Sequence, residues 1–575
     1  MLTRTFAEHV VRPVESLCGL WDFVTADDRR DERKRKKLPG RYTRSILVPS
    51  VWETIPDLVN YRGKGWLRTH IAGADGAAAR LVFGGVSHTG TVYVDGKRIG
   101  GHYDAFTPWD VLATGLDDGE HELVVEVDNS FGPHSTLHIP NDYYTYGGIT
   151  RPAELQFVGE VFIERLRATP RRKRNGTWDL AVAVRLRNWS RNTLRRKAVV
   201  VLDDHAIALP DARIKPGATR EFTGVIEGIE AEPWTAATPR LYDLAAVLFD
   251  GDVIVDDKYD RIGFRDIQVR GKKLLLNGES IRLRGYNRHE DHGQFGCALP
   301  LETHVADLQI LRDLGCNFVR TSHYPNDQRF LDLCDEMGFY VWEESHARQT
   351  PFDPPDFLDQ ISRSTAEMLD RHHNHPSIIL WGLLNECESD TQRGRRVYKH
   401  LIDMIRTADG SRPVTAASHK RQKDVCYDLV DIVSWNLYSA WYGGRPDNIE
   451  AELKPLLKWL HAPGNASGGR GKPVILSEFG AGAIPGYHNM QSSKWTEDYQ
   501  AEALETLLDV YLNHPDLVGA AIWQFCDCRV TEESHAIRRP RTHNNKGTVD
   551  EYRKPKLAYR TVKARMHKAA KTWGV

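Results

Sequence analysis

Short runs of alternating apolar and polar residues fill the first part of the chain. TVYVDGKRIG (residues 91–100) alternates on both sides of Asp95-Gly96, and HELVVEVDNS (121–130) repeats the pattern. Alternation with a period of two indicates strands with one buried face, and Asp-Gly between two such runs indicates a tight hairpin. We therefore predict an all-β domain over residues 1–165.

The same alternation continues in a second group of runs. WDLAVAVRLRN (178–188), AVVVLDD (198–204) and LYDLAAVLFDG (241–251) are spaced as the strands of a small sandwich. The pattern predicts a second all-β domain over residues 166–266.

After residue 267, short apolar runs alternate with amphipathic stretches such as THVADLQILRDLG (303–315) and QAEALETLLDVYLNH (500–514). This order is typical of βα units that build a parallel sheet. The eight strand candidates are IRLRGYN (281–287), NFVRTSH (317–323), FYVWEES (339–345), IILWGLLNE (378–386), PVTAAS (413–418), DIVSWNLY (431–438), PVILSEFG (473–480) and VGAAIWQF (518–525). Eight such units predict a (β/α)8 barrel over residues 267–575.

Charge and cysteine content narrow the class of protein. Lys and Arg total 77 against 78 for Asp and Glu, so the net charge of -1 provides no basic field for nucleic acid. The N-terminal sequence lacks the apolar stretch of a signal peptide, and no run is long enough to cross a bilayer. The eight cysteines show no disulfide-framework spacing. We expect a cytoplasmic protein with reduced, buried thiols, and no membrane or nucleic-acid partner.

Two glutamates follow otherwise apolar barrel strands. Glu386 ends the fourth predicted strand and Glu478 ends the seventh. The C-terminal rim of such a barrel is where catalytic groups are placed. Hydrolysis of a glycosidic bond needs one carboxylic acid to protonate the leaving oxygen and one carboxylate at the anomeric carbon. The other interpretation is that these are two unrelated rim acids held in salt bridges.

Several segments around these glutamates resemble a known family. HNHPSIILWGLLNE (373–386) and KPVILSEFG (472–480) resemble the acid/base and nucleophile segments of glycoside hydrolase family 2. GVSHTGTVYVDGKRIGGHYDAFTPWD (85–110) resembles the family's N-terminal domain. The resemblance implies a multidomain fold: a jelly-roll β-sandwich over 1–165, an immunoglobulin-like β-sandwich over 166–266, and a catalytic (β/α)8 TIM barrel over 267–575.

The resemblance also implies a retaining mechanism, with Glu478 as nucleophile and Glu386 as acid and base. Asn385 would bind the sugar 2-hydroxyl, Tyr438 would contact the nucleophile, His323 would bind a hydroxyl, and Trp523 would form a floor beneath the ring. Taken without the resemblance, a lone histidine or tyrosine at these places is as readily structural, and Trp523 is as readily part of the core. Phe479 departs from the pattern, since a tyrosine is common after the nucleophile.

The loop after the eighth strand bears on the choice of sugar. NNKGTVDEYRKPK (544–556) resembles the Asn-x-Lys signature of the β-glucuronidases in this family, with Asn544 and Lys546 at the matching positions. An ammonium and an amide can bind the C6 carboxylate of a uronic acid through charge-assisted hydrogen bonds. Asp142 and Tyr442 resemble residues that line the same pocket. An assisting arginine is left open among Arg538, Arg539 and Arg541.

The resemblance thus implies an exo-acting β-glycosidase that hydrolyses β-D-glucuronides, working as a homo-oligomer, a dimer or a tetramer. β-Galacturonidase and β-galactosidase are the alternatives within the family, and an inactive carbohydrate-binding protein is the alternative outside the enzyme class. No cofactor or metal is expected. His372, His373 and His375 in RHHNHP lie before the fourth strand, at the bottom of the barrel, and the mechanism needs no metal.

Overall fold

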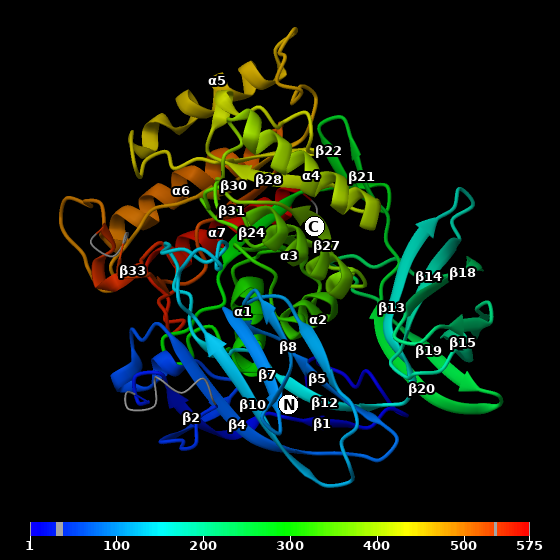
Figure 1. The fold of residues 1–575 in the computed structure, drawn as a ribbon. Coiled ribbons are helices and arrows are strands. Elements are labelled where there is room, and N and C mark those ends of the chain that lie inside the picture. The colour runs from blue at the N-terminus through cyan, green and yellow to red at the C-terminus, as the bar shows by residue number, and fades with distance from the viewer. Residues whose placement is uncertain (1, 30–37, 534–537, 574–575) are drawn as a thin grey trace.

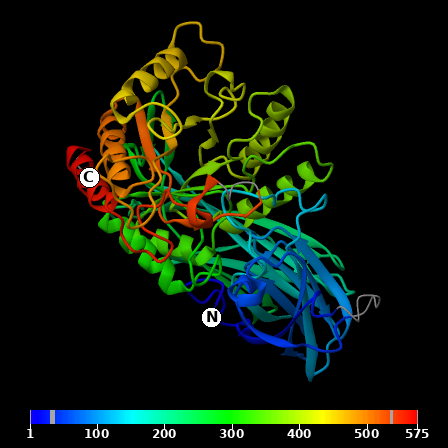
Figure 2. The same ribbon diagram turned by 90° about the vertical axis from the view of Figure 1, so that its left-hand side faces the viewer.

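The structure is a computed structural model that describes residues 2–29, 38–533 and 538–573. The remaining positions within the three predicted domains lie outside this description. Two β-sandwiches lie on one side of a barrel that forms the larger part of the molecule (Figure 1). Seen from the side, the N-terminal sandwich lies at one end and the barrel helices lie at the other (Figure 2).

The N-terminal sandwich packs two antiparallel sheets against each other. One sheet has the strand order β1-β12-β5-β9 and the other β3-β2-β4-β10-β7-β8. The strands are β1 (Val14–Ser16), β2 (Gly19–Thr25), β3 (Arg44–Val48), β4 (Lys64–Ala72), β5 (Ala78–Phe83), β7 (Thr89–Val94), β8 (Lys97–Tyr103), β9 (Trp109–Ala113), β10 (Glu120–Asp128) and β12 (Ala153–Val158). Two short strands, β6 (Val86–Ser87) and β11 (Gly148–Ile149), pair with each other. Apolar residues from both sheets form one core, which confirms the predicted first sandwich.

The predicted Asp95-Gly96 hairpin joins β7 and β8. Val94 pairs with Lys97, so only two residues form the turn. Both have positive φ, 49° at Asp95 and 75° at Gly96. Two-residue hairpins need this left-handed backbone at both central positions, which is why Asp-Gly favours them.

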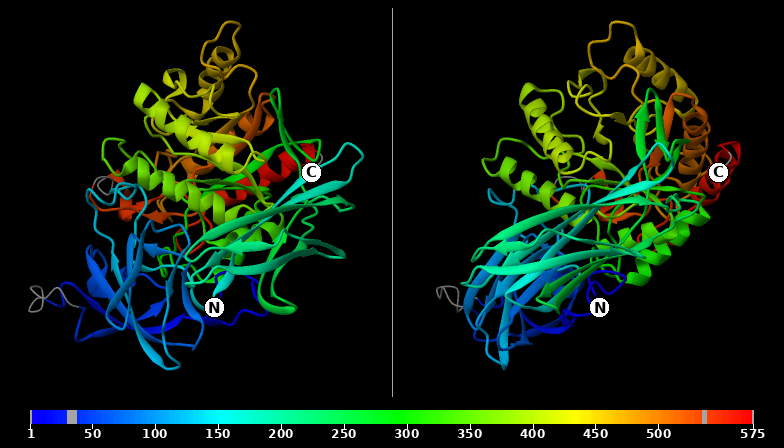
Figure 3. Two further views of the ribbon diagram at one scale, coloured as in Figure 1. Left: turned by 45° about the vertical axis from the view of Figure 1, so that its right-hand side comes forward. Right: turned by 90° about the vertical axis from the view of Figure 1, so that its right-hand side faces the viewer.

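The second sandwich also has two antiparallel sheets. Its strands are β13 (Val161–Arg172), β14 (Trp178–Asn188), β15 (Leu194–Leu202), β16 (His205–Ala208), β17 (Ala212–Ile214), β18 (Thr219–Ile229), β19 (Tyr242–Asp250) and β20 (Val253–Ile262). The predicted boundary at residue 165 falls inside β13, whose pairing with β14 begins at Val161. The second sandwich therefore begins about five residues earlier, at Val161. It lies beside both the first sandwich and the barrel (Figure 3).

A three-stranded sheet leads into the barrel, and all eight predicted barrel strands are present. The small sheet has β21 (Ile267–Arg270), β22 (Lys273–Leu276) and β23 (Glu279–Ile281). The barrel strands are β24 (Leu283–Arg288), β25 (Phe318–Thr321), β26 (Tyr340–Glu344), β27 (Ile378–Gly382), β28 (Val414–Ser418), β29 (Ile432–Asn436), β30 (Val474–Phe479) and β31 (Leu517–Ile522). They close in sequence order, with parallel pairing throughout.

Helices cover the outside of the barrel. They are α1 (Leu301–Asp313), α2 (Gln328–Met337), α3 (Phe357–His372), α4 (Gln392–Ala408), α5 (Ile449–His461), α6 (Glu497–Asn513) and α7 (Ala558–Trp573). The link between β28 and β29 departs from the simple pattern, since residues 419–431 hold only a 3-10 turn, η3 (Arg421–Lys423). Apolar side chains from strands and helices form the largest core of the molecule.

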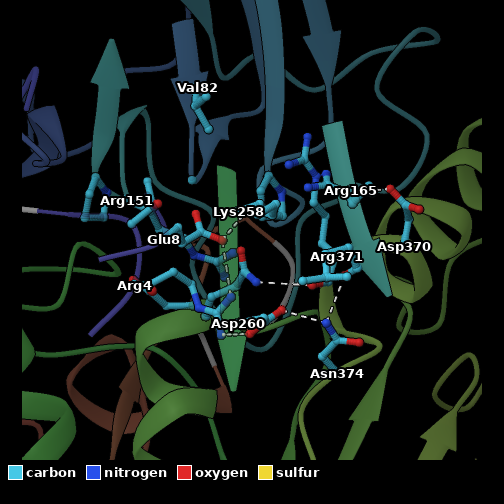
Figure 4. A pocket seen from close by; sticks show the side chains of 17 residues that line it. Arg4, Glu8, Val82, Arg151, Arg165, Lys258, Asp260, Asp370, Arg371 and Asn374 are labelled. Atoms are coloured by element: carbon cyan, nitrogen blue, oxygen red, sulfur yellow. Dashed lines mark hydrogen bonds and ion pairs between the residues drawn. The ribbon is translucent and has the colours of Figure 1, made fainter. Parts of the chain in front are cut away.

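A polar joint connects the three domains near the N-terminus (Figure 4). Glu8 binds Lys258 at 2.7 Å, and Arg4 binds Asp260 of the second sandwich at 3.1 Å. Arg4 also donates to Asp332 of α2 at 2.7 Å, so one guanidinium joins sandwich and barrel. The cavity at this joint is about 40 Å³, which is too small for a sugar.

Two further findings bear on the expectations from sequence. No helix within residues 2–29, 38–533 and 538–573 is long and apolar enough to cross a membrane. The eight cysteines are all free, and six of them are buried, as the cysteine spacing predicts.

Candidate active site

A cavity of about 940 Å³ opens at the C-terminal rim of the barrel. Its lining comes from strand ends and from several loops, which include one of the N-terminal sandwich and those after β26, β28, β29 and β31. The lining residues used below are Asp142, Arg348, Gln349, Glu386, Asn436, Tyr438, Trp441, Tyr442, Glu478, Trp523, Arg538, Arg539 and Lys546. Both predicted catalytic glutamates therefore face one cavity.

Glu478 lies near the end of β30 and is 3% exposed. Each of its carboxyl oxygens accepts a hydrogen bond from a different side. Arg320 Nη1 donates to Oε1 at 3.0 Å, and Tyr438 Oη donates to Oε2 at 2.7 Å. A guanidinium and a phenol at these distances favour the ionised form and fix the orientation of the carboxylate.

Glu386 follows β27 on a backbone with a φ of 53°. Non-glycine residues rarely occupy this left-handed region, and such outliers gather at functional sites. Asn436 Nδ2 donates to Oε1 at 2.8 Å, and Gln349 Nε2 donates to Oε2 at 2.8 Å. Glu386 is thus held by two neutral amides, whereas Glu478 faces a guanidinium.

The two carboxyl groups influence each other electrostatically. Burial and the neighbouring Glu386 raise the pKa of Glu478 to about 7, although Arg320 and Tyr438 act to lower it. The carboxyl groups of Glu386 and Glu478 therefore lie close enough to interact.

A buried network lies behind Glu478. Arg320 donates to Glu344 through Nε and Nη2, both at 2.9 Å, and to Asn385 Oδ1 at 3.0 Å. Asn385 Nδ2 has no hydrogen-bond partner among the described residues. An unpaired amide beside the nucleophile is therefore available to a ligand.

His323 and Trp523 form a stacked pair next to this network. Their ring centroids are 4.9 Å apart with an angle of 15° between the planes. His323 Nδ1 lies 2.9 Å from Glu344, and its Nε2 lies 3.9 Å from Glu478. Trp523 lines the cavity while His323 lies behind it, so the tryptophan offers a flat apolar surface to a ligand.

A loop of the N-terminal sandwich carries Asp142 into the cavity. Arg539 Nε donates to this carboxylate at 2.8 Å, and Nη2 binds its other oxygen. Asn544 Nδ2 also donates to Asp142, at 3.1 Å. Burial alone would raise the pKa of Asp142, but Arg539 and the other nearby cations together have the larger effect. The pKa is therefore lowered, and the side chain is a carboxylate. The Asn544 amide is thus used by Asp142, and Asn544 is not part of the cavity lining.

Lys546 is a buried ammonium at the cavity wall, with 1% exposure. Its Nζ lies 5.4 Å from the ring centres of Trp441 and Tyr442 and 5.8 Å from that of Tyr438. Burial, followed by Arg539, lowers its pKa. Among the described residues, no carboxylate forms a salt bridge with Lys546, so an anionic ligand would supply the missing charge partner.

The position of each arginine narrows the choice of the one that could assist in binding a carboxylate. Arg538 and Arg539 line the cavity, and Arg539 Nη2 also lies 3.4 Å from Tyr442 Oη. Arg541 instead binds Glu551 away from the cavity. Phe479 is fully buried and packs edge-on against Tyr511. Its side chain belongs to the core, so a tyrosine hydroxyl at this position would not reach the cavity.

Several lining residues were missed by sequence reasoning, among them Arg348 and Gln349. Arg348 and Gln349 belong to the loop after β26, which the sequence shows only as a short irregular segment. Nothing in its pattern indicates that Gln349 reaches across to Glu386. Only the sequence position after a barrel strand could have drawn attention to these two residues.

The histidines of RHHNHP do not gather at one point. His372 lies 2.9 Å from Glu343, His373 lies 2.8 Å from Thr169, and His375 lies 2.6 Å from Asp335. Each imidazole thus has its own hydrogen-bond partner.

A barrel with two carboxyl groups facing one rim cavity, one of them beside a guanidinium, is the arrangement of a glycoside hydrolase. The family models agree: residues 267–571 match the TIM barrel domain of the glycosyl hydrolases family 2, and residues 161–265 match a second domain of that family. The chain therefore belongs to glycosyl hydrolase family 2.

Similar proteins act on uronic acids. A GH2 β-galacturonidase from Eisenbergiella tayi, solved bound to galacturonate, is 41% identical with a TM-score of 0.92, covering 99% of both chains. A β-glucuronidase from Streptococcus agalactiae is 27% identical over 98% of this chain and 97% of that protein. A putative β-glucuronidase from Formosa agariphila is 26% identical over 90% of this chain, which spans 66% of that longer protein.

Proposed function

We propose that this glycoside hydrolase is an exo-acting β-D-uronidase in which Glu478 is the nucleophile and Glu386 is the acid and base. The observation that carries the proposal is the pairing of two features in one cavity. Glu478 accepts hydrogen bonds from Arg320 and Tyr438, and Lys546 is a buried cation without an acidic partner among the described residues.

In the first step, Glu386 donates its proton to the glycosidic oxygen while the Glu478 carboxylate attacks the anomeric carbon. The bond between that carbon and the leaving oxygen breaks, and the aglycone leaves as an alcohol. A covalent ester joins the sugar to Glu478. The free amide of Asn385 is placed to bind the 2-hydroxyl, a contact that strengthens in the transition state.

In the second step, the Glu386 carboxylate removes a proton from water, and the water oxygen attacks the anomeric carbon. The ester bond breaks, which regenerates the Glu478 carboxylate and a protonated Glu386. The released sugar keeps the β configuration. Asn436 and Gln349 hold Glu386 in place during both proton transfers.

The preference for a uronic acid rests on the charge of the cavity wall. A C6 carboxylate beside Lys546 would form a charge-assisted hydrogen bond in a partly dry site. The sequence predicts a direct contact between the Asn544 amide and the substrate carboxylate. Asn544 instead donates to Asp142, which in turn holds Arg539, so its contribution to the pocket is indirect. A neutral hexose would leave the ammonium without an anionic partner.

Two uronides fit this proposal. Glucuronide is the substrate implied by the sequence motif, and galacturonide is favoured by the 41% identity to the Eisenbergiella tayi β-galacturonidase. The two sugars differ only in the orientation of the C4 hydroxyl, so the carboxylate contact serves both.

A panel of aryl β-D-glycosides tests the proposal: glucuronide, galacturonide, glucoside and galactoside. We expect kcat/KM for one or both uronides to exceed that for the matching neutral sugar by at least about 100-fold. This factor corresponds to the binding free energy that is lost when a charged hydrogen bond is not formed. Lys546→Ala should reduce this ratio by a similar factor. Equal rates on charged and neutral sugars would contradict the uronide preference, and activity that persists in Glu478→Ala would contradict the nucleophile.

We also propose that the protein is cytoplasmic and forms a homo-oligomer, a dimer or a tetramer. The support is the set of free cysteines, which is typical of a reducing compartment, and the symmetric assembly that is common among soluble proteins. Light scattering during size-exclusion chromatography tests the oligomeric state, and a monomeric mass at micromolar concentration would contradict it.

A further inference from the structure

A second cluster of reactive side chains lies where the N-terminal sandwich meets the barrel. Asp104 follows β8, His138 lies in the loop after β10, and His346 follows β26. One ligand-type atom from each lies within 4.8 Å of those of the other two, and all three side chains are buried. Three segments that are distant in sequence thus bring a carboxylate and two imidazoles together.

Two polar atoms of this cluster have no hydrogen-bond partner among the described residues: Asp104 Oδ2 and His138 Nε2. Their companion atoms are occupied. Asp104 Oδ1 lies 3.1 Å from His346 Nδ1, and His138 Nδ1 lies 2.9 Å from Tyr103 Oη. Buried polar atoms are nearly always satisfied, so two unpaired atoms from adjacent side chains indicate a missing partner.

The surroundings of His138 leave its Nε2 free to bind a metal. When Nδ1–H donates to Tyr103 Oη, the lone pair of the ring lies on Nε2. Imidazoles that bind metals usually donate their second N–H to an oxygen in this way.

Asp104 adds two independent observations. Its backbone φ is 132°, a conformation that side chains rarely adopt, so the carboxylate is kept at this point against local strain. A fully buried carboxylate in proteins is paired with a cation or bound to a metal.

We propose that Asp104, His138 and His346 bind one zinc ion that ties the N-terminal sandwich to the barrel. Zinc takes imidazole nitrogens and carboxylate oxygens at about 2.0–2.2 Å, in tetrahedral sites whose ligand atoms lie roughly 3.3–3.6 Å apart. The 3.1 Å between His346 and Asp104 is close to this spacing. The second Asp104 oxygen or a water completes the four ligands. The ion is structural, so the hydrolytic mechanism itself still needs no metal.

A second buried cluster, Asp332, Asp335 and His375, has similar composition but its charges are already paired. Arg4 donates to Asp332 at 2.7 Å, and His375 lies 2.6 Å from Asp335. Asp335 also accepts the backbone N–H of Ser377 at 2.9 Å. This cluster has no room for a second cation, and it supplies a matched control.

The proposed ion lies close to the active-site loop. Tyr143 Oη lies 3.4 Å from His346 Nε2, and Tyr143 is the neighbour of Asp142 in the sequence. A metal that fixes His346 would therefore hold the segment that carries Asp142 into the cavity. Zinc would position this loop without contacting the substrate.

Zinc content by mass spectrometry tests the inference. The whole protein is incubated with zinc in a buffer that does not chelate metals and desalted against a competing chelator. We expect one zinc ion per chain in the unmodified protein and in His375→Gln. His138→Gln and Asp104→Asn should bind zinc more weakly by at least about 10–100-fold.

Cobalt substitution keeps the test independent of variant folding. Cobalt in the unmodified protein should give the intense visible absorption of a tetrahedral site, and zinc should displace it. An unmodified protein that retains no zinc and shows no such absorption would overturn the inference, leaving an ion pair between Asp104 and His346. Equal zinc binding by His138→Gln and His375→Gln would overturn it as well.

Discussion

At the scale of single residues, the two carboxyl groups of the site differ in the groups that donate hydrogen bonds to them. Glu478 accepts from a guanidinium and a phenol, and Glu386 accepts from two amides. The guanidinium beside Glu478 favours its carboxylate form. This difference supports the proposal that Glu478 is the nucleophile.

The raised pKa of Glu478 predicts a pH dependence. Because its carboxylate must be ionised to attack, kcat/KM should fall as the pH drops below about 7, the pKa that burial and Glu386 give it. Glu386→Gln removes the neighbouring charge, so the acidic limb should move to lower pH. An aryl uronide with a good leaving group keeps the rate of this variant measurable. An acidic limb that stays in place would show that Glu386 does not raise the pKa of Glu478.

The sequence predicted these residues unevenly, for physical reasons. Glu386 and Glu478 follow apolar strands, so their position on the rim is visible in the pattern. Contacts between loops leave no such pattern. Gln349 could therefore not be predicted as a partner of Glu386, and Asn544 was expected to bind substrate although it binds Asp142.

At the scale of elements, the barrel was predictable because each of its strands is an apolar run of fixed length between helical stretches. The β28–β29 link has no helix because residues 419–431 lack the apolar spacing of one. The boundary of the second sandwich was placed inside β13, because the irregular apolar pattern of VFIERLRA does not show where this strand begins. The loop between β10 and β11 has no periodic pattern, so only the resemblance at Asp142 indicated that it reaches the barrel.

That loop carries a prediction of its own. Asp142→Ala removes the anion that holds Arg539 and Asn544, so the wall of the uronate pocket should lose its order. We expect a higher KM for aryl uronides and a loss of about 10–100-fold in kcat/KM, as for other residues that position a ligand-binding group. Steady-state kinetics measures both. Tyr552→Phe, at an exposed position outside the cavity lining, is the control, and an unchanged KM in Asp142→Ala would contradict the positioning role.

At the scale of the whole molecule, buried ion pairs hold three domains in one arrangement. Arg4 contacts Asp332 of the barrel and Asp260 of the second sandwich, and all three side chains are nearly inaccessible. The proposed zinc ion would act in the same way between the first sandwich and the barrel. Both devices matter for catalysis because the cavity has walls from two domains, and its shape depends on their relative position.

The Arg4 joint predicts a large loss of stability from one substitution. Arg4→Ala leaves two carboxylates buried without their cation, which costs about 3–5 kcal/mol when one member of a buried pair is removed. The midpoint of urea unfolding, followed by tryptophan fluorescence, should fall clearly. Arg195→Ala is the matched control, because its ion pair with Asp211 is 69% and 49% exposed and should contribute little. Equal midpoints for the two variants would mean that the joint does not hold the domains together, and that their packing depends on the apolar cores alone.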